Sequence, residues 1–261
     1  MTALRALVTG AGARLGRAMA LTLGERGYDV AVHYATSRDG ADETVAALQD
    51  MGRKAVAIQA NLLDEAAMQA LFPAAVAALG GPISVLVNNA SIFEYDNLTT
   101  ATRDGWDRHM DSNLRAPFVL TQALAAQVPD AVMDGNGEPV AQGLIVNMID
   151  QRVQKLTPEF MTYTLAKMGL WAMTQTTAQA LAPHVRVNGI APGPTLRGHR
   201  QSQSHFDAQR SATILARGAN TNDITAALGY LLDAQAVTGQ MIAVDGGQHL
   251  GWRTPDVQGV E

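Results

Sequence analysis

The sequence predicts an α/β fold: a doubly wound parallel sheet of about seven strands with helices on both faces. Three observations favour it. Short apolar segments alternate with longer helical ones, the first strand runs directly into a glycine-rich turn and a helix, and 47% of the 261 residues are hydrophobic, enough for a substantial core. We therefore expect a single domain over residues 1–261.

In the first half of the chain, strands are expected at 4–9, 29–34, 55–59 and 83–87, and helices at 17–26, 41–51 and 64–79. Between the first strand and helix lies the turn Gly10 to Gly16. Glycines there let the backbone approach a pyrophosphate, and the helix N-terminus offers it unpaired N–H groups. This arrangement is typical of Rossmann-like dinucleotide sites, although a glycine-rich turn alone is a weak signal.

In the second half, residues 102–132 are interpreted as two helices, broken or bent near Pro117, and 134–142 as a surface loop. The remaining elements are strands at 144–147, 185–190 and 241–244 and helices at 159–181 and 222–232. Small residues surround the helix at 159–181, which indicates burial on both faces or packing between subunits. A rigid turn at 191–195 is expected to end its strand.

The polar stretch that follows this turn has the composition of a lid, which we place at about 194–217. Its basic residues are Arg197, His199, Arg200, His205 and Arg210.

Composition excludes several kinds of function. The net charge of -5 and the lack of a Lys/Arg cluster argue against nucleic acid or an anionic membrane as partner. There are no cysteines, so disulfides and thiolate catalysis are excluded, and the six scattered histidines do not predict a metal site. Apolar runs shorter than about 18 residues and the lack of a signal peptide predict a cytoplasmic protein.

The chemistry is expected around Asp150, Tyr163 and Lys167. Tyr163 and Lys167 are four residues apart, a spacing that places their Cβ atoms about 5–6 Å apart on one helix face. A neighbouring ammonium lowers the pKa of a phenol towards neutrality, which makes Tyr163 a candidate proton donor. Two simpler readings remain open: a surface pair for Tyr163 and Lys167, and a helix cap for Asp150.

These motifs resemble, in kind and order, those of the classical short-chain dehydrogenases/reductases over essentially the whole chain. The matching residues are the glycine-rich turn, Asn88-Asn89-Ala90 after the fourth strand, Asn113, Tyr163 with Lys167, and Pro192-Gly193. Two departures resemble the pteridine reductases, including the dihydromonapterin reductases: Arg14 replaces a glycine of the turn, and Asp150 replaces the serine thirteen residues before the tyrosine. His33-Tyr34 and the segment from Asn89 to Phe93 fit that group as well.

The resemblance implies a role for each site residue. Asp150, Tyr163, Lys167 and Asn113 would be catalytic, Lys167 holding the nicotinamide ribose and Asn113 positioning a water and Lys167. The substrate would meet Arg14, Ser91, Phe93, Asp150 and Tyr163, with Phe93 stacked on a flat ring. Core packing for Phe93 and a surface position for Arg14 remain the simpler alternatives.

The implied cofactor is NADPH, because the end of the second strand carries no acid to bind ribose hydroxyls and offers Thr36, Ser37 and Arg38. The implied cofactor-binding residues are Gly10, Arg14, Leu15, Gly16, Tyr34, Thr36, Ser37, Arg38, Asn61, Leu62, Asn89, Ala90, Lys167, Pro192, Gly193 and Thr195. Family resemblance and the small-residue helix suggest a homotetramer.

Three functions compete. The first is NADPH-dependent reduction of a dihydropterin such as dihydromonapterin or dihydrobiopterin, with acceptance of dihydrofolate left open. The second is reduction of a carbonyl such as a 3-oxoacyl group, and the third is non-catalytic NADP binding by a regulator. Asp150 discriminates between the first two, because a carboxylate repels a developing oxyanion but accepts hydrogen bonds from pterin N–H groups.

Overall fold

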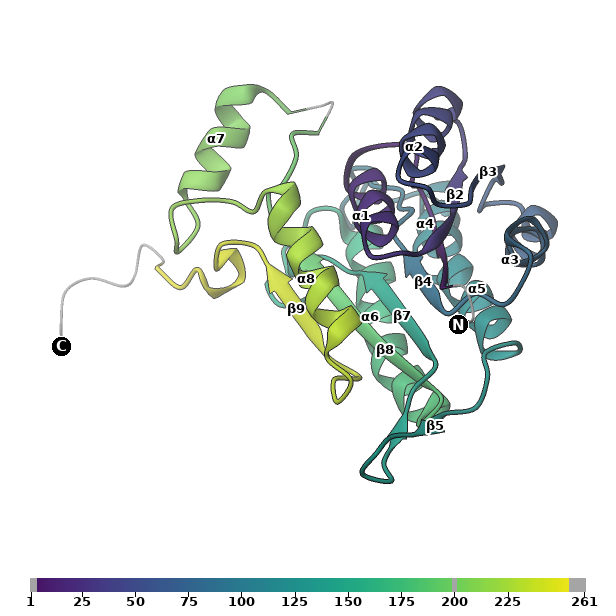
Figure 1. Ribbon diagram of the computed structural model, residues 1–261. Helices are drawn as coiled ribbons and strands as arrows, with labels where there is room; N and C mark the ends of the chain where they lie inside the picture. The colour runs from purple at the N-terminus through teal and green to yellow at the C-terminus, as the bar shows by residue number, and fades with distance from the viewer. Residues whose placement is uncertain (1–3, 199–200, 254–261) are drawn as a thin grey trace.

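The computed structural model describes residues 4–198 and 201–253. A seven-stranded parallel sheet with the order β3-β2-β1-β4-β7-β8-β9 forms its centre (Figure 1). The strands are β1 (Arg5–Val8), β2 (Asp29–Tyr34), β3 (Ala55–Gln59), β4 (Val85–Asn88), β7 (Gly143–Met148), β8 (Val185–Pro192) and β9 (Met241–Val244). The α/β class and the seven-stranded parallel sheet are confirmed.

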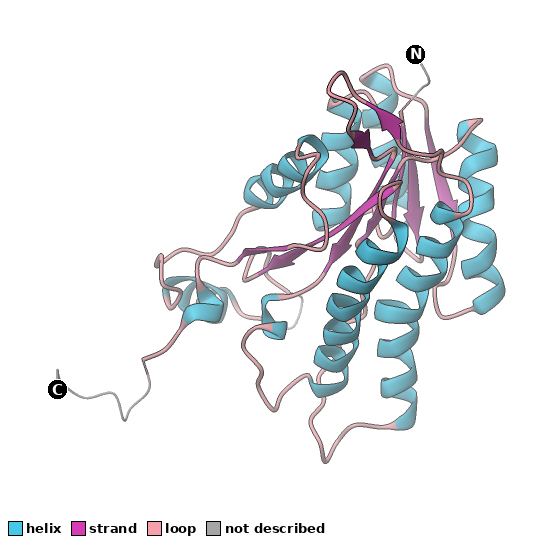
Figure 2. Ribbon diagram, turned by 90° about the horizontal axis from the view of Figure 1, so that it is seen from below, coloured by secondary structure: helices cyan, strands magenta, loops and turns pink. Residues whose placement is uncertain are grey.

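Helices cover both faces of the sheet, because successive strand residues point to opposite sides. Ala6 and Val8 of β1 pack under one layer, whereas Leu7 packs under the other. The first layer holds α1 (Arg14–Glu25), α2 (Arg38–Asp50) and α8 (Thr221–Asp233), and the second holds α3 (Glu65–Leu79), α5 (Ala116–Ala125) and α6 (Met161–Leu181). Figure 2 shows the sheet between these two groups of helices.

The direction of strand order reverses at β1, which pairs with β2 on one side and with β4 on the other. In doubly wound sheets, ligands bind beyond the carboxyl ends of the strands at such a switch point. The turn that follows β1 and the asparagines that end β4 therefore lie next to each other at the edge where a site is expected.

The region from Thr102 to Val132 differs from the expected pair of helices. Helix α4 (Arg103–Met110) continues through a π-helical segment, η1 (Asp111–Arg115), into α5, which ends at Ala125. Pro129 explains the early end, because proline disfavours helical backbone in the residue before it. The expected surface loop is part of a hairpin in which β5 (Val132–Met133) pairs antiparallel with β6 (Pro139–Val140).

Two further expectations are corrected between β8 and α8. Strand β8 does not stop at Ile190 but continues through Pro192, which pairs with Val244 of β9. A proline is tolerated there because the strand on the other side, β7, has already ended opposite Ile190 and needs no N–H donor. The lid segment also contains a helix, α7 (Gln203–Ser211), which stands off from the sheet (Figure 1). His199 and Arg200 lie outside the described residues.

Within the described ranges, no helix is both long and apolar enough to cross a membrane. The same part of the chain holds no group of three or more His, Asp or Glu side chains arranged to bind a metal ion.

Candidate active site

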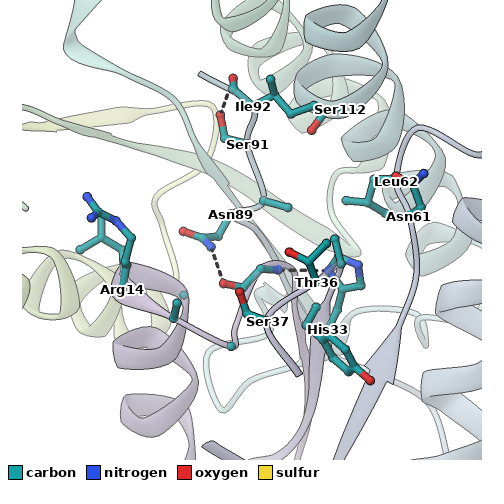
Figure 3. Close-up of a pocket in the computed structure, with 18 of the residues that line it drawn as sticks. Arg14, His33, Thr36, Ser37, Asn61, Leu62, Asn89, Ser91, Ile92 and Ser112 are labelled. Carbon is teal, nitrogen blue, oxygen red and sulfur yellow. Dashed lines mark hydrogen bonds between the residues drawn. The ribbon is translucent and has the colours of Figure 1, made fainter. Parts of the chain in front are cut away.

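A groove of about 400 Å³ lies at the switch point of the sheet (Figure 3). Most of the expected cofactor-binding residues line it: Gly10, Arg14, Leu15, Gly16, Tyr34, Thr36, Ser37, Asn61, Leu62, Asn89 and Ala90, together with Ser91. In Figure 3, Arg14 lies at one end of the groove, and Asn61 and Leu62 lie at the other. No acidic side chain is among the described residues that line this groove.

The glycine-rich turn needs its glycines for both conformation and space. Gly10 has a φ of +65°, and a Cβ at Gly16 would lie 2.1 Å from the carbonyl oxygen of Gly10. Asn89 holds the turn by donating its Nδ2 to the carbonyl of Thr9 at 2.8 Å. No side chain caps the N-terminus of α1, so its first N–H groups are available to a phosphate.

His33 supports the turn from the end of β2, a role the sequence did not reveal. Its Nδ1 accepts the backbone N–H of Gly10 at 3.1 Å, and its Nε2 lies 3.1 Å from the carbonyl of Ala60 and donates to it. Burial lowers the pKa of His33 to about 4. The ring is therefore neutral at pH 7 and serves as one acceptor and one donor.

Of the three residues from which NADPH was expected, Thr36, Ser37 and Arg38, only the first two line the groove. Arg38 does not: its exposed side chain pairs with Asp42 on the surface of α2, with 3.5 Å between Nε and Oδ2. As the first residue of α2, Arg38 lies one position too late along the chain to share the groove wall with Ser37.

A second cavity, of about 760 Å³, continues from the groove and shares Arg14, Leu15 and Ser91 with it. Pro192 at the end of β8 and the following residues 193–196 line it, and α7 contributes His205, Phe206 and Gln209. Part of the expected lid therefore borders this cavity. The lining also includes Asp150 and three aromatic residues, Phe93, Tyr95 and Phe160, which we call the aromatic wall.

Asp150, Tyr163 and Lys167 come together as the sequence predicts. Asp150 follows β7, and its Oδ2 accepts the hydroxyl of Tyr163 at 2.9 Å. Its Oδ1 accepts the N–H of Arg152 at 2.9 Å and so caps the short helix η2 (Gln151–Val153). Lys167, one helical turn beyond Tyr163, donates its Nζ to the carbonyl of Met148 at 2.7 Å. Asp150 is therefore both a cap and a partner of Tyr163.

Burial and Asp150 control the protonation of this cluster. They raise the pKa of Tyr163 well above its usual value, with Arg152 and Ser91 acting in the opposite direction. Burial also raises the pKa of Asp150 and lowers that of Lys167 to about 8, although Asp150 partly sustains the lysine charge. The expectation that Lys167 lowers the pKa of Tyr163 is not met, because burial and Asp150 raise it. Tyr163 is protonated at neutral pH and can donate a proton.

Asn113 has a different contact from the expected one beside Lys167. It lies in the π-helical segment and is fully buried. Its Oδ1 accepts the N–H of Ile92 at 2.9 Å, and its Nδ2 donates to the carbonyl of the same residue at 2.8 Å. Asn113 therefore fixes the backbone immediately before Phe93. Such π segments recur at functional sites.

Phe93 belongs to an aromatic stack. Its ring lies parallel to that of Phe160, with centroids 4.3 Å apart and 7° between planes, and the guanidinium of Arg152 lies 4.8 Å from the centroid of Phe160. Tyr95 meets Phe160 edge-on at 5.2 Å. Phe93 is 44% exposed, so core packing does not explain it. Phe160 was not expected from the sequence, although its position one turn before Tyr163 could have indicated it.

Arg14 and Thr195 are held by the loop after β8. The guanidinium of Arg14 donates to the carbonyls of Leu196 and Arg197 at 3.0 and 2.9 Å, whereas the resemblance implied contacts with cofactor and substrate. Arg14 has a φ of +52°, the left-handed region favoured by the glycine that it replaces in the resembling motif. Thr195 is buried and donates its hydroxyl to the carbonyl of Gly193 at 3.0 Å.

Comparison with known proteins places this geometry in a family. A family described as enoyl-(acyl carrier protein) reductase matches residues 10–249. The 3-oxoacyl-[acyl-carrier-protein] reductase FabG of Staphylococcus aureus is 32% identical over 250 residues, covering 94% of this chain and 98% of the relative. A short-chain dehydrogenase/reductase of Armillaria gallica is 32% identical over 256 residues, covering 93% and 94%. The chain belongs to the short-chain dehydrogenase/reductase family. It is an oxidoreductase, which argues against a non-catalytic regulator.

Among solved structures, FolM alternative dihydrofolate reductase 1 from Brucella canis, complexed with NADP, is similar to this chain with a TM-score of 0.90. The two are 40% identical, and the match covers 98% of this chain and 97% of the other. This identity exceeds that to the 3-oxoacyl reductase.

Proposed function

We propose that the protein reduces a dihydropterin with NADPH. The observation that carries this proposal is the position of the Asp150 carboxylate, which lines the cavity together with aromatic side chains. It accepts a hydrogen bond from the Tyr163 hydroxyl at 2.9 Å. A pterin has a donor-rich edge with amino and ring N–H groups and two flat faces. A carboxylate and aromatic rings complement both features, whereas a simple ketone uses neither well.

The residues present fit NADPH in the groove at the switch point. Side chains at Gly10 and Gly16 would fill the cradle of the turn, α1 presents an uncapped N-terminus, and no acidic residue among those described in the lining opposes a 2′-phosphate. The solved relative from Brucella canis is complexed with NADP. We propose that Thr36 and Ser37 bind the 2′-phosphate, Asn61 and Leu62 border the adenine, and Asn89, Ala90, Lys167 and Pro192–Thr195 hold the nicotinamide half.

When bound, NADPH supplies a hydride, and residues of this chain position the ring and supply the proton. Tyr163 is protonated and donates a proton to the reduced ring, directly or through a water. Asp150 accepts N–H groups of the substrate. It also aligns Tyr163, whose hydroxyl donates to its Oδ2. Phe93 offers a ring face for stacking, which contributes about 0.5–1.5 kcal/mol beyond burial. Arg14 and Ser91 border both cavities, where cofactor and substrate meet.

A specific observation favours a second candidate, reduction of a 3-oxoacyl thioester, because FabG is similar over nearly the whole chain. Asp150 argues against it: in its ionised form, a carboxylate beside Tyr163 repels the oxyanion that forms on a reduced carbonyl. The name of the Brucella relative includes dihydrofolate, which carries a dihydropterin ring, and this favours the first candidate.

The deciding experiment is NADPH oxidation measured against a panel of substrates. The panel contains dihydromonapterin, dihydrobiopterin, dihydrofolate and an acetoacetyl thioester. We expect the dihydropterins to give the highest kcat/KM. A thioester reduced far faster than every dihydropterin would establish the second candidate instead.

We predict that Ser37→Glu weakens NADPH binding at least about tenfold and NADH binding much less, because a carboxylate in the groove repels the 2′-phosphate. Dissociation constants for both cofactors, measured by fluorescence titration, test this. Arg38→Ala is the matched control: because Arg38 pairs with Asp42 outside the groove, we expect a small effect. A larger loss for Arg38→Ala than for Ser37→Glu would mean that Arg38 is the phosphate ligand.

We also propose that the protein is a homotetramer. Large apolar side chains on α4, α5 and α6 are more than two-fifths exposed in one chain: Trp106, Phe118 and Leu165. Covering such side chains is favourable by about 25 cal/mol per Å² of apolar surface. Light scattering after size-exclusion chromatography gives the mass, and a monomer at micromolar concentration would contradict the assembly.

A further inference from the structure

A buried chain of hydrogen bonds lies behind the aromatic wall of the second cavity. Thr162, the residue before Tyr163, donates its hydroxyl to Oδ2 of Asp96 and its backbone N–H to Oδ1 of Asp96, the latter at 3.2 Å. The Nδ1 of His109 lies 2.7 Å from the hydroxyl of Thr162. The backbone N–H of Glu94 donates to the Nε2 of His109 at 3.1 Å. All three side chains are buried, at 7% exposure or less.

The direction of the hydrogen bonds between these side chains follows from the backbone N–H group at one end of the series. The N–H of Glu94 can only donate, so Nε2 of His109 carries no proton and Nδ1 carries the proton of the neutral ring. Nδ1 therefore donates to the oxygen of Thr162, whose own hydrogen points to Asp96. Asp96 is left as the acceptor of two hydrogen bonds. Burial lowers the pKa of His109, in agreement with a neutral ring.

These bonds join the two segments that form the aromatic wall. One segment, 92–96, carries Phe93 and Tyr95; the other, 160–163, carries Phe160 and Tyr163. Besides the bonds of Thr162, the N–H of Phe160 donates to the carbonyl of Asp96 at 2.8 Å. The rings of Phe93 and Tyr163 consequently meet edge-to-face, with centroids 4.7 Å apart and 72° between planes.

Phe160 shows that this junction constrains the backbone. It has a φ of +54°, in the left-handed region that costs a residue with a Cβ about 1 kcal/mol or more. It precedes α6 without a side-chain cap. The surrounding contacts must hold this conformation: the bond to Asp96, the stack on Phe93 and the guanidinium of Arg152.

We propose that Asp96, Thr162 and His109 form a positioning cluster that fixes the Phe93 segment against Tyr163 and thereby determines how tightly the cavity holds a flat bicyclic ring. This inference rests on the proposed pterin chemistry. None of the three residues is among those lining the cavity, so they act through Phe93, Phe160 and Tyr163 and not by touching the ligand. A small carbonyl substrate, which does not stack, depends on the cluster much less.

The test compares Thr162→Val with Thr162→Ser. Valine keeps the branched shape but removes the hydroxyl that links Asp96 to His109, whereas serine keeps the hydroxyl. The measurements are the dissociation constant of a diaminopteridine in the presence of NADP, KM and kcat for a dihydropterin, and the dissociation constant of NADPH. Thr176→Val is the matched control, because Thr176 lies exposed on the same helix and bonds only within it.

We expect Thr162→Val to weaken diaminopteridine binding and raise KM about tenfold or more, because it leaves buried polar partners unsatisfied. We expect Thr162→Ser to keep most of the wild-type affinity and KM. NADPH binding is expected to be unchanged in every variant. Should Thr162→Val fold poorly, His109→Phe tests the same idea, since it keeps a ring beside Tyr163 but removes both hydrogen bonds.

Three outcomes overturn the inference, and they are distinguishable. If wild-type protein binds the diaminopteridine and Thr162→Val binds it equally well, the positioning role fails while the proposed function stands. If Thr162→Val weakens NADPH and diaminopteridine by the same factor, the cluster is only a general stabiliser. If wild-type protein binds NADPH but neither binds the diaminopteridine nor reduces a dihydropterin, the proposed function fails, and this inference fails with it.

Discussion

Tyr163→Phe is expected to lower kcat for a dihydropterin by at least about 100-fold, because it removes the proposed general acid. The substitution deletes one oxygen and keeps the ring that packs against Phe93. NADPH binding is expected to stay within about twofold of wild type, since the phenol hydroxyl contacts Asp150 and does not line the cofactor groove. Single-turnover kinetics and a cofactor titration measure the two effects separately.

Lys167→Ala is the informative comparison for Tyr163→Phe. We propose that Lys167 holds the nicotinamide ribose, so its loss is expected to weaken NADPH binding as well as turnover. A Tyr163→Phe enzyme that retained most of its rate would show that the proton comes from Asp150 or from water. Parallel losses of cofactor binding in both variants would instead indicate that Tyr163 shapes the cofactor site.

Much of the sheet could be predicted from hydrophobic pattern. The expected bounds of β2, β3 and β9 agree with the structure to the residue. Each is a short run rich in β-branched and apolar residues, bounded by polar or glycine-containing segments, and this is the strongest local signal a strand can give. The parallel order then follows from the alternation of strands and helices.

Elements that bury little apolar surface could not be predicted in this way. Helix α7 has no buried residue, so it has no apolar face to reveal its period, and only the cap from Ser202 to the N–H of His205 indicates where it begins. The β5–β6 hairpin is short and exposed, and the carboxylate of Asp134 stabilises its turn by accepting the N–H groups of Asn136 and Glu138. Such local polar contacts leave no hydrophobic pattern.

In the site, spacing along one element was predictable and contacts between distant segments were not. The one-turn spacing of Tyr163 and Lys167 determines their common helix face, and the neighbourhood of Asp150 follows from the order of the strands. The bond from Arg14 to Leu196 spans 182 residues, and nothing in the local sequence of either residue indicates it. The Phe93–Phe160 stack depends in the same way on how two loops fold against each other.

Asp150→Asn is expected to lower kcat/KM for dihydropterins by about 10- to 100-fold, the cost of losing hydrogen bonds to a charged acceptor. Asparagine has nearly the same shape and retains an oxygen that can cap η2 through the N–H of Arg152. The loss would therefore reflect charge and acceptor capacity, not a misplaced loop. The same panel of dihydropterins and an acetoacetyl thioester measures the effect.

The same variant also tests the electrostatics of the cluster. The charge of Asp150 and its hydrogen bond both raise the pKa of Tyr163, so Asp150→Asn is expected to lower that pKa. The alkaline limb of the pH–rate profile should move to lower pH if it reports Tyr163. Asp150 also sustains the charge of Lys167, whose pKa is about 8, so a limb that reported Lys167 would move in the same direction. An unmoved limb would show that it reports a group that Asp150 does not influence.

The thermal stability of Asp150→Asn gives an independent check, because it is expected to hold or rise where activity falls. Burial raises the folded-state pKa of Asp150 above its unfolded value, so the native protein binds more protons and the ionised carboxylate costs stability at neutral pH. Asp150→Asn removes that cost, and its Tm at pH 7 is expected to equal or exceed that of wild type. The difference should shrink as the pH falls to the pKa of Asp150. A large drop in Tm would mean that the carboxylate is chiefly structural.

Asp150→Ser completes the argument, because it installs the residue that is usual in the wider family at this position. A serine hydroxyl is a neutral donor that can stabilise an oxyanion, and it does not offer a pterin the anionic acceptor. We therefore expect the ratio of thioester to dihydropterin activity to rise in Asp150→Ser, with the dihydropterin rate falling most. An equal loss on both substrates would show that Asp150 serves catalysis in general. It would leave the choice of substrate to the aromatic wall formed by Phe93, Tyr95 and Phe160.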